Sequence, residues 1–399
     1  MKFAEQQLKQ ILPKQKEVNK YLNFLKNCFT PPQFNHVRNY IGRLVALNKK
    51  TIKSISSSSK EEKDQSSLNR FLTESDWNED DVQDRYVKKI SHQTRGKPIS
   101  LLIDDSISKK TGKQIEEAQY HKDHAGNGYV FGHQIVTALI ICMGLLLPLF
   151  PKLYSKKTHS KIELAKQIIE YASSRIKISQ VIIDSWYVCN DIIKLCLKKG
   201  ITLIGNLKSN RVIQFEKGDW IKLGKYYNSV SRKKKAFQTV IIDDATYKLH
   251  SIIVRLKKVG FVKIVISRQW IEGKKRWSRP FYIVCTDISK SDICVLNEYT
   301  KRWSIETFHK DIKQSLGLEA YQMRLKKGIT RHIILVTLSY AILKLMMFFK
   351  KVSWTIGECI KYIQDKEFDD LIIEIVNIED KKERIKMAKE LLLNENAKV

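Results

Sequence analysis

Length, composition and charge narrow the classes of protein that this sequence can encode. The chain has 399 residues, 43% of them hydrophobic, so it can bury a sizeable core and divide into more than one domain. Its 72 Lys and Arg against 42 Asp and Glu leave a formal charge of +30. An excess of this size favours a large polyanionic partner, and we expect nucleic acid.

Cysteine usage and hydropathy indicate the compartment. The seven Cys residues form no C-x-x-C pair, which is typical of free thiols in a reducing compartment. Two apolar stretches, 135–150 and 333–349, are expected to be buried strands and a core helix, because Gly144, Pro148 and Lys344 interrupt them. The first residues are polar, unlike a signal peptide. We therefore expect a cytoplasmic, nucleoid-associated protein without a membrane segment.

Helical patterns dominate the first 95 residues. Apolar residues recur at helical spacing before residue 50 and again over 68–90, and a Ser- and charge-rich segment between them, 54–67, predicts a flexible loop. The residues from Thr73 to Asp76, just before Trp77, are a candidate helix start. We expect 1–95 to form a helical DNA-binding domain. The alternative is a helical cap that makes no base contacts.

From residue 96 the pattern changes to short apolar runs that alternate with helices. Strands are predicted at 99–103, 129–143, 145–154, 180–183 and 202–205, and helices at 161–174 and 188–199. Near-continuous apolar strands joined by helices indicate a mixed α/β sheet covered on both faces. We assign residues 96–208 to the first part of this core.

The remaining chain divides into three further regions. Alternating segments separated by basic turns predict a β-rich insertion over 209–285. Helical periodicity resumes at Asp292 and continues to about Lys350, so residues 286–349 are expected to form the second part of the core. Residues 350–399 are predicted to form short, charged C-terminal helices.

Two Asp residues share one local context. Asp104 and Asp184 each follow a short apolar run that predicts a buried strand, and both are expected at its end. Side chains at the carboxyl edge of a sheet are held rigidly, and the loops beside them leave room for a substrate. One Asp after one strand usually caps a turn. Two such strands in one basic chain favour a pair of carboxylates at a functional site.

A polar stripe supplies a third carboxylate. At about 100° per residue, Tyr299, Arg302, Glu306 and Lys313 fall within roughly 60° of one another on a helix surface. A solvated charged face is the ordinary explanation of such a stripe. Here a carboxylate, suited to a cation, lies beside a phenol, a guanidinium and an ammonium, which suit phosphate oxygens.

The Tyr-x2-Arg-x3-Glu-x6-Lys spacing resembles the signature of a large family of bacterial insertion-sequence transposases in the DDE superfamily. The segments that begin at Asp104 and Asp184 resemble the family's first two catalytic blocks, and Tyr321 to Arg324 also resemble it. The resemblance covers roughly 98–345. It implies an RNase H-like core, and hence an α/β fold whose mixed sheet is flanked by helices.

The resemblance also implies a reaction. Asp104, Asp184 and Glu306 would be catalytic ligands of two Mg²⁺ or Mn²⁺ ions in a cut-and-paste transfer of insertion-sequence ends to target DNA. The residues expected to contact DNA are Tyr299, Arg302, Lys313, Arg324, Lys109 and Lys110. The partners would be double-stranded DNA, as element ends and target, and a second copy of the chain in the synaptic complex.

Some alternatives remain at this stage. Asp105 is adjacent to Asp104 and points to the opposite face of a strand, and the Asp-x-Ser spacing favours Asp104 as first ligand. Trp220, Trp270 or Trp277 could stack on a flipped base or be core residues. The same carboxylates would also serve an RNase H-like nuclease without strand joining. A domesticated, inactive DNA-binding protein is the third reading.

Overall fold

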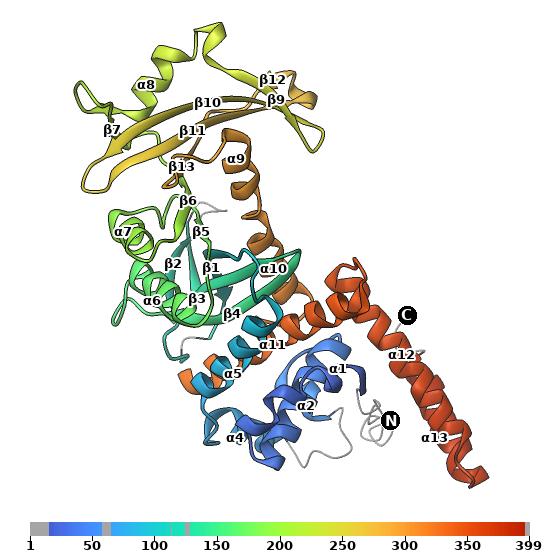
Figure 1. Ribbon diagram of the computed structural model, residues 1–399. Coiled ribbons are helices and arrows are strands. Elements are labelled where there is room, and N and C mark those ends of the chain that lie inside the picture. The colour runs from blue at the N-terminus through green and yellow to red at the C-terminus, as the bar shows by residue number, and fades with distance from the viewer. Residues whose placement is uncertain (1–15, 58–64, 113, 124–127, 396–399) are drawn as a thin grey trace.

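The computed structural model describes residues 16–57, 65–112, 114–123 and 128–395, and Figure 1 shows their arrangement. A mixed sheet runs through the centre. Its first part contains β1 (Ser100–Lys109), β2 (Gln119–Asp123), β3 (Gly128–Cys142), β4 (Leu145–Tyr154), β5 (Gln180–Ile183) and β6 (Thr202–Leu207). These strands are rich in Ile, Leu and Val, and most of the side chains of β1, β3 and β5 are buried.

The strand order identifies the core. The order β4-β3-β1-β5-β6 has β3 antiparallel to both β1 and β4, whereas β1, β5 and β6 are parallel. A meander of three strands followed by two parallel crossovers is the arrangement of the RNase H-like fold. The predicted fold class, a mixed α/β sheet flanked by helices, is therefore confirmed.

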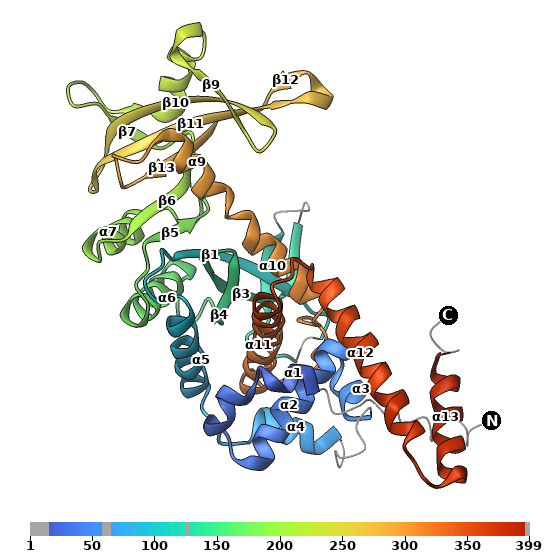
Figure 2. The same ribbon diagram turned by 45° about the vertical axis from the view of Figure 1, so that its right-hand side comes forward.

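Helices cover both faces of this core. Helices α6 (Lys161–Arg175) and α7 (Asn190–Lys198) lie together on one side, and α10 (Trp303–Gln314) and α11 (Lys326–Lys350) lie on the other (Figures 1 and 2). Helix α11 is long and apolar enough to cross a membrane, yet 83% of its apolar window is buried inside the protein. It is the central helix of the core.

The sheet continues into the predicted insertion. Strand β13 (Phe281–Cys285) pairs with β6, and β11 (Gly260–Ile271) and β10 (Ala245–Leu256) follow as a long hairpin. Four short strands and one helix complete this region: β7 (Val212–Gln214), β8 (Ile221–Lys222), α8 (Leu223–Val230), β9 (Gln238–Ile242) and β12 (Arg276–Trp277). The helix α8 was not expected from the alternating sequence.

The N-terminal helices pack against α11. They are α1 (Lys16–Lys20), α2 (Pro31–Ala46), α3 (Ile52–Ser57), α4 (Gln65–Thr73) and α5 (Glu79–Gln93). The buried Arg331 of α11 donates hydrogen bonds to the carbonyl oxygens of Phe71, Leu72, Ser75 and Trp77 and to Glu79. One cation thus satisfies the chain ends of α4 and α5 and fixes both helices on the core.

Two local expectations for this region were wrong. The predicted loop 54–67 is helical at both ends, over 52–57 and from 65, and residues 58–64 lie outside the described residues. The helix predicted to start at 73–76 starts later, because Asn78 accepts the backbone N–H groups of Asp80 and Asp81 and forms the N-cap of α5.

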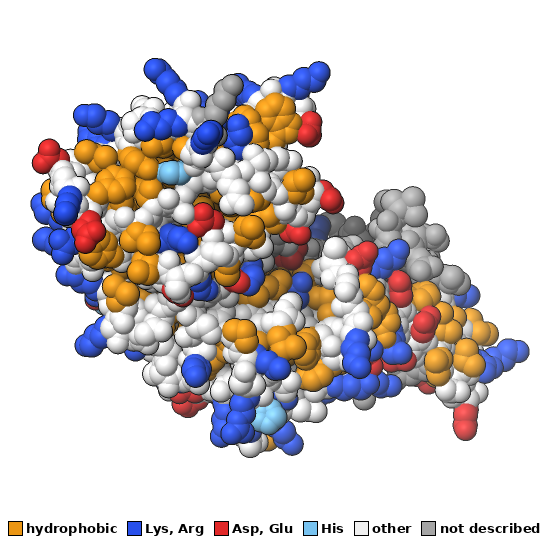
Figure 3. Space-filling model, turned by 45° about the horizontal axis from the view of Figure 1, so that its top comes forward, with side chains coloured by type: hydrophobic (Ala, Val, Ile, Leu, Met, Phe, Trp, Pro, Cys, Tyr) orange, Lys and Arg blue, Asp and Glu red, His pale blue; other side chains and the backbone are white. Residues whose placement is uncertain are grey.

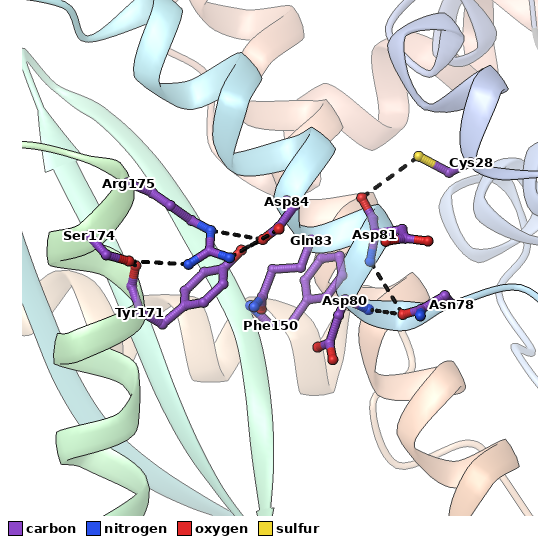
Figure 4. Close-up of polar contacts among 10 residues, drawn as sticks. All are labelled: Cys28, Asn78, Asp80, Asp81, Gln83, Asp84, Phe150, Tyr171, Ser174 and Arg175. Atoms are coloured by element: carbon purple, nitrogen blue, oxygen red, sulfur yellow. Dashed lines mark hydrogen bonds and ion pairs between the residues drawn. The ribbon is translucent and has the colours of Figure 1, made fainter.

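Figure 4 shows how α5 joins the core. Asp84 of α5 accepts hydrogen bonds from Tyr171 (2.6 Å) and Arg175 of α6 (3.0 Å). The side chain of the preceding residue, Gln83, accepts the backbone N–H of Phe150 in β4 at 3.2 Å. A single helix therefore contacts both a core helix and the edge of the sheet.

The two C-terminal helices are longer than predicted. Helices α12 (Ile356–Val376) and α13 (Lys381–Glu395) project from the body; they follow one line in Figure 1, and Figure 2 shows that α13 turns back from the end of α12. A capping box between Thr355 and Glu358 starts α12, and its 21 residues contain no Pro and no Gly beyond Gly357 in the first turn. The expectation of short helices was wrong.

Candidate functional site

Asp104 and Asp184 occupy equivalent positions on neighbouring parallel strands. The ladder between β1 and β5 ends with the pair Ile103 and Ile183, so each Asp is the first residue beyond it. Strand β5 stops there, as expected. Strand β1 does not, because it continues beside β3 as far as Lys109, which corrects the expectation that Asp104 ends its strand. The two carboxylates emerge at the same edge, where the parallel strands part.

The environment of Asp104 is unfavourable for a negative charge. Only 18% of its side chain is exposed. Burial and the neighbouring charge of Asp184 raise the pKa of Asp104 to about 7, while a hydrogen bond from the Asp105 N–H opposes this shift. Asp184 itself accepts the backbone N–H groups of Trp186 (2.8 Å) and Tyr187 (3.4 Å). A positive charge beside Asp104 and Asp184 would therefore stabilise the two carboxylates.

Asp105 has a different environment. It accepts hydrogen bonds from the Tyr187 hydroxyl (2.8 Å), from Lys161 (3.0 Å) and, at short range, from the amide of Gln134. These three donors come from the loop after β5, from α6 and from β3. Asp105 is consequently held inside the core by fixed partners, on the face of β1 opposite to Asp104.

The polar stripe does not lie on one continuous helix. Helix α9 (Asp292–Thr300) ends after Tyr299, and α10 begins at Trp303, with i to i−3 hydrogen bonds through the turn between them. The prediction that one helix carries the whole stripe was wrong. The backbone at Arg302 stays near helical, at φ −55° and ψ −31°, so the side chains of the stripe still face one region.

Arg302 connects the first carboxylate with the third. Its Nη2 lies 2.6 Å from Glu306 Oε1 and its Nη1 lies 3.6 Å from Asp104 Oδ2. The Nε of Arg302 is buried and has no hydrogen-bond partner. Asp104, Asp184, Arg302 and Glu306 thus form one cluster with three acidic groups and one cation.

The donor chemistry of this cluster fits a hard divalent cation, although its arrangement does not yet form a cage. Carboxylate oxygens are the ligands that Mg²⁺ and Mn²⁺ prefer. No group of three His, Cys, Asp or Glu among the described residues is close enough to hold a metal ion. The positive charge beside Asp104 and Glu306 comes instead from Arg302, whose guanidinium contacts both carboxylates.

The other stripe residues differ in exposure. Tyr299 is only 7% exposed and packs on Phe281, and burial raises its pKa to about 12. Lys313 donates to the Ile107 carbonyl oxygen of β1 at 2.8 Å, and burial lowers its pKa. Tyr299 is therefore largely enclosed, whereas Lys313 is partly accessible beside β1.

Three further cations predicted to contact DNA lie together. Lys109, Lys110 and Arg324 line a cavity of about 580 Å³ beyond the end of β1. Lys110 lies 3.3 Å from the centre of the Tyr321 ring and donates to the carbonyl oxygens of Glu319 and Tyr321. Burial lowers the pKa of Lys110 to about 8.

Sequence patterns missed several residues of the site. Lys161 and Gln134 contact Asp105 across 56 and 29 positions of sequence, respectively. Trp186 is 51% exposed beside Asp184, with the Lys161 ammonium 4.5 Å from its ring centre. His309 on α10, by contrast, was already expected beside the stripe from the sequence; it lies 2.7 Å from the Thr137 hydroxyl of β3, and burial lowers its pKa to about 3. Trp186 had a local signal, an aromatic residue two positions after the second Asp.

The three tryptophans considered for base stacking are all in the insertion. Trp270 and Trp277 contact each other edge to face at 5.3 Å, and Lys248 lies 4.6 Å from the Trp277 ring. Trp220 is 43% exposed. Figure 3, which views the molecule with its top turned forward, shows many Lys and Arg side chains and fewer acidic ones around hydrophobic patches on that face.

A family model covers half of the chain. Residues 152–353 match the model of the DDE transposase family described as "Archaeal putative transposase ISC1217". The chain belongs to this DDE transposase family. The matched segment contains Asp184, Glu306 and the entire insertion, and Asp104 lies before it.

A curated relative points the same way. The chain is 23% identical over 250 residues to a protein of Microchaete diplosiphon described as "Probable transposase for insertion sequence element IS701". The match covers 57% of this chain and 65% of the relative, so the chain spans slightly under two thirds of that protein's length.

Two solved structures show more distant likeness. A cryo-EM synaptic complex of piggyBac transposase with hairpin DNA is 13% identical, with a TM-score of 0.47 over 96% of this chain and 83% of that one. Endonuclease V of Ciona intestinalis, bound to a 23mer DNA, is 9% identical, with a TM-score of 0.25 over 58% of this chain and 99% of that one. Both TM-scores lie below 0.5, and neither structure informs the function of this chain.

Proposed function

We propose that this member of the DDE transposase family cleaves the ends of an insertion sequence and joins them to target DNA. The observation that carries the proposal is the cluster at the edge of the core sheet. Asp104 and Asp184 emerge side by side from parallel strands, and Arg302 ties Asp104 to Glu306. Phosphoryl transfer needs a rigid group of carboxylates beside cations that hold phosphate oxygens, and this edge of the sheet supplies both.

The three carboxylates would hold two Mg²⁺ or Mn²⁺ ions, which supply activation of the attacking oxygen and stabilisation of the leaving oxygen. In this proposal Asp104 and Asp184 are ligands from the sheet, and Glu306 is the ligand from α10. Asp105 is a positioning residue, because its three donors fix β1 beneath Asp104. Arg302 releases the carboxylates and turns its guanidinium to a phosphate oxygen of the DNA.

In the same proposal, the other residues of the Tyr-Arg-Glu-Lys signature position Arg302 and bind DNA phosphates. Tyr299 lies behind Arg302, with its ring 5.9 Å from the guanidinium carbon, and limits where that side chain can turn. Lys313 extends the cationic surface along α10 toward the Ile107 carbonyl oxygen. Lys109, Lys110 and Arg324 continue it around the 580 Å³ cavity. The substrate would be double-stranded DNA on the nucleoid, with two copies of the chain bringing two ends together.

The test is a cleavage and joining assay. The full chain is mixed with Mg²⁺, labelled duplexes from the DNA that flanks its gene, and a supercoiled target. Glu306→Gln is compared with Asp311→Asn, a control on the same helix α10 whose carboxyl faces Lys344 of α11. We expect wild type and the control to nick and join the ends, and Glu306→Gln to lose at least ~1000-fold in rate.

Each alternative has its own outcome in this assay. Nicking without end preference and without joined product would instead identify a nuclease. Binding of the end duplexes without cleavage by any form of the protein would identify an inactive DNA-binding protein. Equal activity of Glu306→Gln and wild type would refute the assignment of Glu306.

A further inference from the structure

A second cationic cavity has none of the clustered carboxylates in its lining. It measures about 500 Å³ at the junction between α7 and the insertion. Two apolar side chains, Val212 and Leu256, form part of its wall. Its polar lining comprises Asn190, Asn210, Arg211, Lys257 and Lys258. No Asp or Glu lines it, so three cations face a shared space with no acidic neighbour in the lining.

The cavity is built from three fixed segments. Arg211 donates from Nη2 to the Val188 carbonyl oxygen at 3.0 Å, which ties the start of the insertion to the loop before α7. A guanidinium has five N–H donors, so this bond leaves others for a ligand. Asn190 is the first residue of α7, where the helix dipole and free backbone N–H groups favour an anion.

The two lysines come from the turn between β10 and β11. Leu256 pairs with Gly260 across this hairpin, and the Val259 N–H donates to the Leu256 carbonyl oxygen at 3.1 Å. Lys258 has a left-handed backbone, with φ +66°, that L side chains seldom adopt. The turn presents Lys257 and Lys258 as neighbouring exposed ammonium groups, an arrangement that repels itself until an anion lies between or beside them.

We propose that this cavity binds a backbone phosphate of duplex DNA. Guanidinium, ammonium and amide groups are the side chains that contact phosphate oxygens without reading sequence. No aromatic ring lines the cavity, so it offers a base no surface for stacking, and a free nucleotide fits it poorly. The exposed lysines open to the surface, where a long polyanion can pass.

The position of the cavity gives the contact a distinct meaning. Helix α7 lies on the side of the core sheet away from α10 (Figures 1 and 2). The stripe on α10 and this cavity therefore contact different parts of the bound DNA. The inference rests on DNA as the proposed substrate, and it is independent of the cleavage chemistry.

The experiment measures the salt dependence of DNA binding by the full chain. A 30-bp duplex of arbitrary sequence is titrated between roughly 50 and 200 mM salt, and the slope of log K against log salt counts the phosphates released from counterions. The test variant is Lys257→Gln with Lys258→Gln. The matched control is Lys198→Gln with Lys199→Gln, which removes the same charge from exposed positions at the other end of α7.

We expect the test variant to reduce the slope by about 1, which corresponds to the loss of one phosphate contact, and to weaken binding roughly tenfold at 0.1 M salt, while the control stays near wild type. Equal slope changes in both variants would refute the site, because they would report surface charge in general. An unchanged slope in the test variant would refute it as well. Inorganic phosphate is also tested as a competitor of DNA binding. If it competes with wild type but not with the test variant, while the slope of the variant is unchanged, the cavity is a free-phosphate site and the proposal is overturned.

Two further measurements keep the outcome decisive. Asn210→Asp places a carboxylate in the lining without touching the hairpin turn, so it tests the site even if the double variant fails to fold. We expect it to weaken DNA binding in the same way. Cleavage by the test variant separates this proposal from the previous one. If the slope changes in the variant but wild type never cleaves DNA, the phosphate site is supported and the transposase chemistry is refuted.

Discussion

The strands of the core and of the insertion form one continuous sheet, but the two parts differ in how far their side chains are buried. In the core, β1, β3 and β5 are covered by helices, and residues on both faces are buried. In the insertion, β10 and β11 expose one face, where Ile253 is 50% and Phe261 47% exposed. The comparison indicates that the core fixes a few side chains to within narrow limits, whereas the insertion offers a broad basic surface that tolerates change.

The largest effect should follow from removing a fixed partner in the core. Asp105→Ala leaves Lys161, whose side chain is 11% exposed, and the Tyr187 hydroxyl without their acceptor. We expect a loss of about 3 kcal/mol in the free energy of unfolding, measured by urea denaturation. Asp104→Asn should leave stability unchanged or raise it, because it removes repulsion with Asp184. Equal destabilisation by both substitutions would contradict the distinction between the two residues.

A pair of glycines compares the two sheets directly. A Cβ on Gly205 of β6 would lie 2.5 Å from a methyl carbon of Val188 and 3.2 Å from Ile183, so Gly205→Ala forces the strand away from the Asp184 loop. We expect a cost of about 2 kcal/mol and reduced activity. Gly273 in the insertion has nothing within 4 Å of an added Cβ, and Gly273→Ala should change stability by less than about 0.5 kcal/mol. Thermal unfolding of both variants tests this, and a larger effect at Gly273 would reverse the comparison.

A buried carboxylate outside both sheets sharpens the contrast with Asp105. Glu367 of α12 is 5% exposed, and both its oxygens lack hydrogen-bond partners. Burial raises its pKa to about 8, and the charge of Arg43 in α2 opposes this only in part. The folded state therefore holds a proton that the unfolded chain releases near pH 4.5.

The consequence for pH follows from that sign. Stability from the neutral Glu367 is fully present below pH 4.5 and is lost as the pH rises through about 8, by at most about 1.4 kcal/mol per pH unit. Glu367→Gln should remove this decline between pH 5 and 8, as measured by denaturation at several pH values. An identical pH profile for wild type and variant would show that the carboxyl is satisfied by partners.

The sequence was informative where the signal is local. The apolar runs before Asp104 and Asp184 predicted buried strands, and the structure has β1 and β5 at these positions. The buried helix α11 was likewise expected from its apolar stretch 333–349, which only Lys344 interrupts. In each case burial on all sides leaves little choice of residue, so the pattern is strong.

The sequence did not predict contacts between residues that are far apart along the chain. Nothing near Asp105 indicates that Lys161, Gln134 and Tyr187 meet it, because only the fold brings α6, β3 and the loop after β5 together. The break between α9 and α10 was missed for another reason. The helical spacing of side chains persists through the turn at Arg302, and only the backbone hydrogen bonds reveal the interruption.

The most direct test of the central claim exchanges one proposed ligand atom. Asp184→Cys replaces a carboxylate oxygen by a softer sulfur, which binds Mg²⁺ poorly and accepts Mn²⁺ better. Cleavage of labelled end duplexes is measured in each metal beside wild type. We predict that the variant is inactive with Mg²⁺ and regains part of its activity with Mn²⁺. Full activity of the variant with Mg²⁺, or no recovery with Mn²⁺ where wild type is active with both, would contradict ligation by Asp184.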